Sequence, residues 1–410
     1  MEFSFVLVKP AKVLTLLLAL AVIGMAGSGC IAPSSGGGCG GPGAQGWSGF
    51  ASYDGILYFG SMDGEVVAVD PSARSLGLAF PSEREWAFAV KAGGAPGTLC
   101  GPVGCAPASR KVALYSTPVV TDQLVCVATY VDDGGIVMGI NRLAPGYTEG
   151  VPLWSKGEWV YPGGTKSIGA IVGSLVLVED IIYFGSSDGK VYALDAVYGE
   201  KKWEFDTGGK IWTSPAVKDG IIYAGNYDGR LHALSRQDGR PLWEIELPAA
   251  LASSPVAFEG NVFFGAFDHY LYAVDGDNGK ERWKFEGGNW FWADPVVKDN
   301  VVYAACLDDT IYALDARSGR ELRRFVADSA IVSTPVIVDD LLVAVSESGE
   351  VYVLELDSLA LQRQVSIGYS VMAPLSAEDG TVYVHARDHS VYCVDVQKGV
   401  VAWKFSSVAD

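Results

Sequence analysis

Aromatic residues recur every 40 positions along more than half of the chain, and this period limits the fold more than any other feature. One series consists of Tyr192, His232, Tyr272, Tyr312, Tyr352 and Tyr392. A second series has the members Trp203, Trp243, Trp283, Arg323, Arg363 and Trp403. Pro215, Pro255, Pro295 and Pro335 form a third. Because six units stay in register, the chain is predicted to be a series of equivalent structural units.

Each unit has the pattern of four short antiparallel strands. In the unit from Trp212 to Ile245, apolar runs of strand length end in Asp-Gly pairs, the strongest short signal for a tight hairpin. A four-stranded sheet with two apolar faces must pack between neighbours, and radial repetition provides those neighbours. Where the second turn lacks Gly, it has His269, Asp309 or His389, and such residues tolerate a positive φ angle.

Two irregular units precede the six regular ones. The first begins at Trp47, and the second runs from Ser116 to about Trp154. Two plus six units predict an all-β, eight-bladed β-propeller of four-stranded antiparallel blades, forming one domain over residues 47–410. The last unit carries its own fourth strand, Val400 to Phe405, and the first carries its own first strand. We therefore expect the ring to close without strand exchange.

The first 46 residues are predicted to be a targeting segment and a tether, outside the folded domain. The apolar stretch Val13 to Ala26 is too short to span a bilayer comfortably. Small residues then precede Cys30, as in a bacterial lipoprotein signal, although Gly27 stands where Leu is usual. Residues 1–30 are thus a lipoprotein-type signal peptide with Cys30 as the lipidation site, or alternatively an ordinary secretory signal or an uncleaved anchor. Residues 31–46 are rich in Gly and Ser and are expected to be a flexible tether.

The charge and the cysteines restrict the partners and the compartment. A formal net charge of −18 argues against nucleic acid, and against adhesion of the folded surface to an anionic bilayer. Cys100 and Cys105 lie in one Gly/Pro-rich loop, where a disulfide is predicted if the protein is exported. Cys126 and Cys306 fall on predicted buried strands and are expected to be core side chains. No metal site is predicted, since the pair His385 and His389 offers too few ligands.

The segment from Ala193 to Trp203 resembles the tryptophan-docking motif, Ala-x-Asp-x-x-x-Gly-x-x-x-Trp, of the PQQ-type propeller repeat family. The resemblance covers about residues 47 to 405. It implies a structural role for the Trp of each fourth strand, which docks onto the neighbouring blade. The residues to which this role is assigned are Trp86, Trp154, Trp203, Trp243, Trp283 and Trp403.

The same family includes quinoprotein dehydrogenases, which bind PQQ and Ca²⁺ on the propeller axis, and non-catalytic outer-membrane assembly lipoproteins of the BamB type. The chain is similar to the second group, with a signal peptide, a Cys, a tether and eight blades. It lacks the adjacent Cys pair of the dehydrogenases, and only Asp294 and Asn289 suggest a ligand site. The resemblance therefore implies a monomeric, membrane-anchored scaffold for envelope or membrane proteins, without catalysis, PQQ or Ca²⁺. The alternatives are a PQQ- and Ca²⁺-dependent dehydrogenase and a propeller that binds a small molecule or a glycan.

Two candidate binding regions follow from the loops, where propellers carry their binding residues. The insertion 155–167 contains Trp159, Tyr161 and Lys166, an aromatic and cationic set that suits a protein interface. The alternative is that its aromatics cap the ends of neighbouring blades. The second region consists of equivalent positions before the first strand of a blade: Trp47, Trp212 and Trp292. These rings are candidates to stack a flat ligand at the central channel, with inter-blade packing as the alternative.

Overall fold

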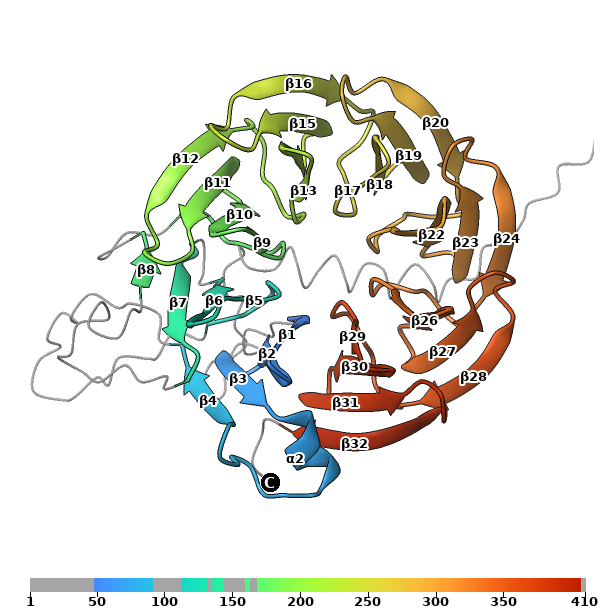
Figure 1. Ribbon diagram of the computed structural model, residues 1–410. Coiled ribbons are helices and arrows are strands. Elements are labelled where there is room, and N and C mark those ends of the chain that lie inside the picture. The colour runs from blue at the N-terminus through green and yellow to red at the C-terminus, as the bar shows by residue number, and fades with distance from the viewer. Residues whose placement is uncertain (1–47, 91–111, 131–133, 144–158, 163–167, 407–410) are drawn as a thin grey trace, which may run out of the picture. The chain divides into compact units, whose positions relative to one another are not determined.

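The computed structural model describes residues 48–90, 112–130, 134–143, 159–162 and 168–406. These residues form eight four-stranded antiparallel sheets, which follow one another around a common axis (Figure 1). The predicted eight-bladed β-propeller is therefore confirmed. Within the described ranges, no helix has both the length and the apolar character needed to cross a membrane.

We number the sheets one to eight in chain order, each from its innermost to its outermost strand (Figure 1). Sheet one is β1 (Phe50–Tyr53), β2 (Ile56–Gly60), β3 (Glu65–Val69) and β4 (Trp86–Ala89), with a short helix α2 (Pro71–Ser75) between β3 and β4. Sheet two is β5 (Val119–Val120), β6 (Leu124–Ala128), β7 (Val137–Asn141) and β8 (Trp159–Tyr161). Sheet three is β9 (Val176–Val178), β10 (Ile181–Gly185), β11 (Lys190–Asp195) and β12 (Lys201–Asp206). Sheet four is β13 (Ala216–Lys218), β14 (Ile221–Gly225), β15 (Arg230–Ser235) and β16 (Pro241–Glu246).

Sheets five to seven repeat the strand lengths of sheets three and four, whereas sheet eight has longer second and fourth strands. Sheet five is β17 (Val256–Phe258), β18 (Asn261–Gly265), β19 (Tyr270–Asp275) and β20 (Glu281–Glu286). Sheet six is β21 (Val296–Lys298), β22 (Val301–Ala305), β23 (Thr310–Asp315) and β24 (Glu321–Val326). Sheet seven is β25 (Val336–Val338), β26 (Leu341–Val345), β27 (Glu350–Glu355) and β28 (Leu361–Ser366). Sheet eight is β29 (Ser376–Glu378), β30 (Thr381–Ala386), β31 (Ser390–Asp395) and β32 (Val400–Ser406).

The core lies between the sheets. One apolar cluster, for example, joins Phe263 and Leu271 of sheet five to Val302 and Leu314 of sheet six. The second and third strands of each sheet are therefore buried on both faces, and their sequences are continuous apolar runs. The outer strands face solvent and alternate between exposed and less exposed residues, as β16 does.

The turns explain the residues that interrupt these runs. His269, Asp309 and His389, which replace Gly in the second turn of their sheets, have φ angles of 73°, 69° and 63°. The prediction that these residues would adopt a positive φ is confirmed. Because the second turn links the second strand to the third, it lies on the same face as the loops between sheets, which we call the loop face.

The docking motif joins most sheets to the next, and sheets five and six show how. The indole N–H of Trp283 donates to the carbonyl oxygen of Ala316, 2.9 Å away in sheet six. A Cβ atom on Gly319 would lie 2.6 Å from the Trp283 ring, and Gly319 has a φ of 69°. Asp315 holds this turn by accepting the backbone N–H of Ser318 at 2.8 Å. The Gly and Asp of the motif thus build the surface onto which the ring packs.

The other docking bonds follow the same plan. They run from Trp86 to Arg142 O (3.0 Å), from Trp203 to Arg236 O (3.2 Å) and from Trp243 to Gly276 O (2.9 Å). Trp403 is 8% exposed and packs between sheets eight and one. Arg323 replaces Trp in sheet six, and the facing turn of sheet seven has Leu359 where the motif has Gly. A Trp ring could not pack there as Trp283 packs on Gly319, because even a Cβ atom at that position crowds the ring. In sheet seven, Arg363 replaces the Trp although the facing Gly399 is retained.

Sheet two corrects two predictions. Its outer strand begins at Trp159, which is 7% exposed and donates to Ala196 O at 3.0 Å, over Gly199 of sheet three. Trp159 is therefore the docking residue of this sheet, the role that the sequence analysis gave to Trp154, which lies outside the described residues. It is not an exposed residue of a partner-binding loop. The insertion before β8 shifted the Trp from its expected place in the repeat.

The ring closes between sheet one and sheet eight, and each contains only its own strands. The prediction of closure without strand exchange is thus confirmed. Side-chain packing and hydrogen bonds between side chains and backbone join the two sheets instead. Ser376 Oγ accepts the N–H of Phe50 at 3.2 Å and donates to its carbonyl oxygen at 3.0 Å. His385, 1% exposed, lies 3.3 Å from Ser48 O, and Phe80 packs on Phe405 with ring centroids 4.9 Å apart.

Replacing Ser376 with alanine is expected to lower the free energy of unfolding by about 1–2 kcal/mol, because it leaves the Phe50 N–H without its acceptor. Chemical denaturation of the full chain measures this. Ser52→Ala is the control, since the Ser52 hydroxyl bonds Glu378 across the same junction at an exposed position. A similar loss in both variants would contradict the role given to Ser376.

Candidate functional site

Several predicted site residues cannot be placed. Cys30, Cys100, Cys105, Trp47, Trp154 and Lys166 lie outside the described residues. Tyr161 is half-buried at the end of β8, with its ring 6.1 Å from that of Tyr192 in sheet three. With Trp159 buried as well, the two described members of the first candidate region pack against the next sheet. This agrees with the capping alternative and not with an exposed interface.

The second candidate region belongs to a larger group on the loop face. Five aromatic side chains there, each half-buried, form a continuous series across sheets four to six, which we call the aromatic row: Trp212, Tyr227, Phe267, Trp290 and Trp292. The ring centroids of Trp212 and Tyr227 are 4.7 Å apart, and those of Tyr227 and Phe267 are 5.7 Å apart. Phe267 lies 5.0 Å from Trp290 and 5.8 Å from Trp292. All of these spacings are those of favourable aromatic pairs.

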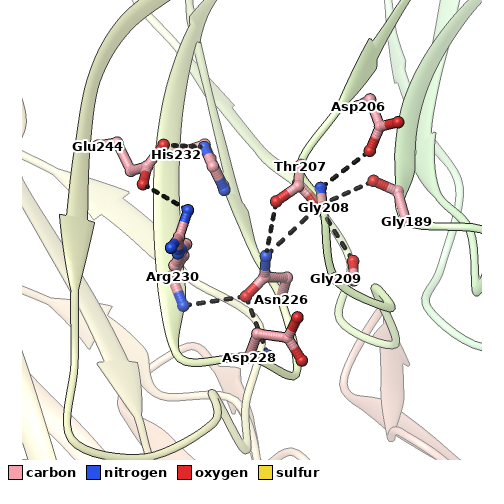
Figure 2. A network of polar contacts seen from close by, with 10 residues as sticks. All are labelled: Gly189, Asp206, Thr207, Gly208, Gly209, Asn226, Asp228, Arg230, His232 and Glu244. Atoms are coloured by element: carbon pink, nitrogen blue, oxygen red, sulfur yellow. Dashed lines mark hydrogen bonds and ion pairs between the residues drawn. The ribbon is translucent and has the colours of Figure 1, made fainter.

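The turn that carries Tyr227 is fixed by a buried amide. Asn226, 2% exposed, donates to Thr207 O at 3.1 Å and accepts the N–H groups of Asp228 at 3.1 Å and Arg230 at 2.9 Å (Figure 2). These bonds tie the turn to the loop that follows sheet three. Tyr227 therefore projects from a rigid position.

His232 makes this sheet differ from its neighbours. In sheets three, five, six and eight, the Tyr at this position bonds an Asp four residues earlier, as Tyr272 bonds Asp268 at 2.6 Å. His232 instead lies 3.3 Å from Glu244, which also pairs with Arg230 (Figure 2). Burial lowers the pKa of His232 below its usual value, although Glu244 acts in the opposite direction. The imidazole is therefore neutral at neutral pH.

Three polar groups of the aromatic row are available to a ligand. Within the described part of the chain, the hydroxyl of Tyr227 and the indole N–H groups of Trp290 and Trp292 make no hydrogen bond. The indole N–H of Trp212, in contrast, donates to Ser187 Oγ at 3.1 Å. The row thus combines apolar ring surface with free hydrogen-bond donors.

A belt of hydrogen bonds joins the sheets beside this row. Between sheets two and seven, the backbone N–H at one equivalent position before the first strand donates to the side chain at the same position of the next sheet. The bonds are Thr117 to Ser174 (3.3 Å), Ser174 to Ser214 (2.8 Å), Ser214 to Ser254 (3.0 Å), Ser254 to Asp294 (2.6 Å) and Asp294 to Thr334 (3.2 Å). Asp294 is the one carboxylate among these described bonds; the other acceptors are hydroxyls.

Asp294 has an unusual environment for a carboxylate. Burial raises its pKa from 3.8 to about 6, against the opposing effect of hydrogen bonds from Ser254 and Thr334. No Lys, Arg or His of the described ranges forms an ion pair with it. Asn289 does not complete a Ca²⁺ site, because its amide points to Leu307 O at 3.5 Å while Asp294 bonds Ser254. Asp294 and Asn289 therefore do not form the carboxylate–amide pair that the metal of a quinoprotein would need. Among the described residues, no group of three His, Cys, Asp or Glu side chains is placed to bind a metal ion.

The opposite face has its own exposed apolar residues. They lie between the third and fourth strands of sheets one to three: Leu76, Leu78, Leu143, Val197 and Tyr198, with Tyr198 71% exposed. The equivalent turn of sheet five has Asp277 and Asn278. On this face the exposed apolar residues of these turns thus belong to sheets one to three, whereas the aromatic row on the loop face belongs to sheets four to six.

The sequence analysis found Trp212 and Trp292 but missed Tyr227 and Phe267. Both lie in the turn after the second strand, where the sequence analysis considered only the position of the Gly. Aligning that position across the repeats would have shown the change: Ser187, Tyr227, Phe267, Leu307, Glu347 and Arg387.

Comparison with known proteins gives a family and a fold. The family model described as "Outer membrane protein assembly factor BamB" matches residues 42–207, 136–252 and 187–405. The crystal structure of BamB from Moraxella catarrhalis is similar, with 14% identity and a TM-score of 0.63 over 84% of this chain and 95% of that chain. The computationally designed Ika8 protein gives 19% identity and a TM-score of 0.63 over 85% and 96%. No curated protein sequence matches significantly.

Proposed function

The chain belongs to the family of the outer membrane protein assembly factor BamB, and from this premise we propose that it is a non-catalytic propeller that binds other proteins of the cell envelope. The aromatic row is the observation that carries this proposal. Half-buried Trp and Tyr rings with free N–H and O–H groups are the residue types that dominate protein interfaces. They also lie on loops, whereas the strands are occupied by packing between sheets.

Membrane anchoring is the second part of the proposal. A diacylated Cys30 followed by the tether of residues 31–46 would hold the propeller near a membrane. In a cell with two membranes the proposed partner is an outer-membrane or envelope protein under assembly. No quinone or Ca²⁺ takes part.

Photocrosslinking in the native cell tests the partner. A photoreactive phenylalanine analogue replaces Tyr227 in the full-length chain, and products are identified by mass spectrometry. One discrete envelope protein is expected. Tyr198 is the matched control, because it is an exposed Tyr on the opposite face. Capture of the same protein from position 198 and not from position 227 would place the interface on the opposite face and contradict the role of the aromatic row.

The anchor is tested separately with Cys30→Ala. This change is expected to abolish labelling by a fatty-acid analogue and to release the protein from the membrane fraction. Retention of both properties would disprove the anchoring part while leaving the crosslinking result to stand by itself.

A further inference from the structure

Asp294 is a charged group without a counter-charge at a place where the fold does not require one. Its structural task, accepting the N–H of Ser254, is performed by hydroxyls in Ser174, Ser214 and Ser254. Thr334 performs it for Asp294 itself. Burying a carboxylate costs desolvation free energy, and a hydroxyl suffices at this position in the neighbouring sheets. The carboxylate therefore points to an interaction other than the hydrogen bonds between sheets.

The segment that leads to Asp294 carries the end of the aromatic row. Residues alternate along it: Trp290, Trp292 and Asp294 are half-buried, whereas Phe291 and Ala293 are buried. Trp212 in sheet four and Trp292 in sheet six occupy equivalent positions, and sheet five has Ala252 at this position. Ala252 is two residues before Ser254, whose N–H donates to Asp294. In the repeat, the positions occupied by Trp212 and Trp292 thus flank the small residue Ala252, close in the chain to the N–H group that Asp294 accepts.

We propose that Asp294 forms a binding site for an alkylammonium group together with two rings of the aromatic row: Trp292, two residues before it, and Phe267, whose ring centroid lies 5.8 Å from that of Trp292. The carboxylate supplies the opposite charge, and the ring faces attract a cation through their quadrupoles. The net charge of −18 favours the approach of a cation over that of an anion. This goes beyond the scaffold function, because it concerns the recognition of one chemical group, whichever molecule carries that group.

Two sources have this chemistry: a free quaternary amine and a lysine side chain presented by a polypeptide. Tryptophan fluorescence of the full chain reports binding, since Trp290 and Trp292 belong to the site. The probes are choline, Nα-acetyl-lysine amide and the neutral choline isostere 3,3-dimethyl-1-butanol. We expect one of the two cations to bind at least about ten-fold more tightly than the neutral isostere.

Variants separate the carboxylate from the rings. Asp294→Asn is expected to weaken cation binding about ten-fold while leaving the weak binding of the neutral isostere unchanged. Trp292→Leu is expected to weaken both. Asp277→Asn, an exposed carboxylate on the opposite face, is the matched control and should change nothing. Asp294→Ser, which copies the neighbouring sheets, serves as a second variant if Asp294→Asn folds poorly.

Preference for choline would assign the site to a free quaternary amine, and preference for the lysine derivative to a polypeptide. Equal binding of the cations and the neutral isostere, or unchanged cation binding in both Asp294 variants, would overturn the proposal. Neither result bears on crosslinking from position 227, so the two proposals fail independently.

Discussion

Trp283→Ala is expected to lower the free energy of unfolding by about 3–5 kcal/mol, the range for removing a buried aromatic side chain. Trp283 is 8% exposed, its N–H bonds Ala316 O at 2.9 Å, and its ring fills the space above Gly319. Removing the ring therefore leaves a void between sheets five and six and frees the Ala316 carbonyl. Urea denaturation followed by circular dichroism measures the loss.

The chain provides its own control for this prediction. Arg323 occupies the equivalent position one repeat later and is exposed. Arg323→Ala is expected to change stability by less than about 0.5 kcal/mol, as for most surface substitutions. Equal losses in Trp283→Ala and Arg323→Ala would show that the docking contact does not hold the sheets together.

Asp294→Ser is expected to stabilise the propeller by about 2 kcal/mol at pH 7.5, because it removes a carboxylate that burial disfavours. The serine hydroxyl can still accept the Ser254 N–H, as Ser254 Oγ accepts that of Ser214 at 3.0 Å. The Asp294 pKa is raised to about 6 by burial, from 3.8, so the folded state binds this proton more tightly than the unfolded state. The wild type therefore loses stability as pH rises from about 4 through about 6.

The gain in Asp294→Ser should accordingly be full above pH 7, shrink as pH falls through about 6, and vanish near pH 4. Denaturation midpoints of both proteins across this range provide the measurement. Asp277→Ser, at an exposed turn, is the control and should give a difference that does not depend on pH in this way. A less stable Asp294→Ser at pH 7.5 would mean that the carboxylate makes a favourable contact that outweighs its desolvation.

The architecture can be predicted from the sequence, because strand lengths, turn residues and the docking motif are all local patterns. A 40-residue period with Asp-Gly turns admits few arrangements other than a ring of small sheets, and the count of eight followed directly. The positive φ angles of His269, Asp309 and His389 followed from the same alignment.

Which side chains meet between sheets could not be predicted in this way, because those contacts depend on how the sheets pack. Trp159 was misassigned because an insertion changes sequence spacing without changing the space between sheets two and three that a docking ring must fill. The aromatic row joins residues from turns and interblade loops that lie up to 80 positions apart, and no local pattern relates them. Asp294 looked like an isolated carboxylate in the sequence; its partners, Ser254 and Thr334, each lie one full repeat away. The repeat therefore specifies the framework, whereas the burial and pairing of these exceptional residues depend on contacts that exist only once the ring has formed.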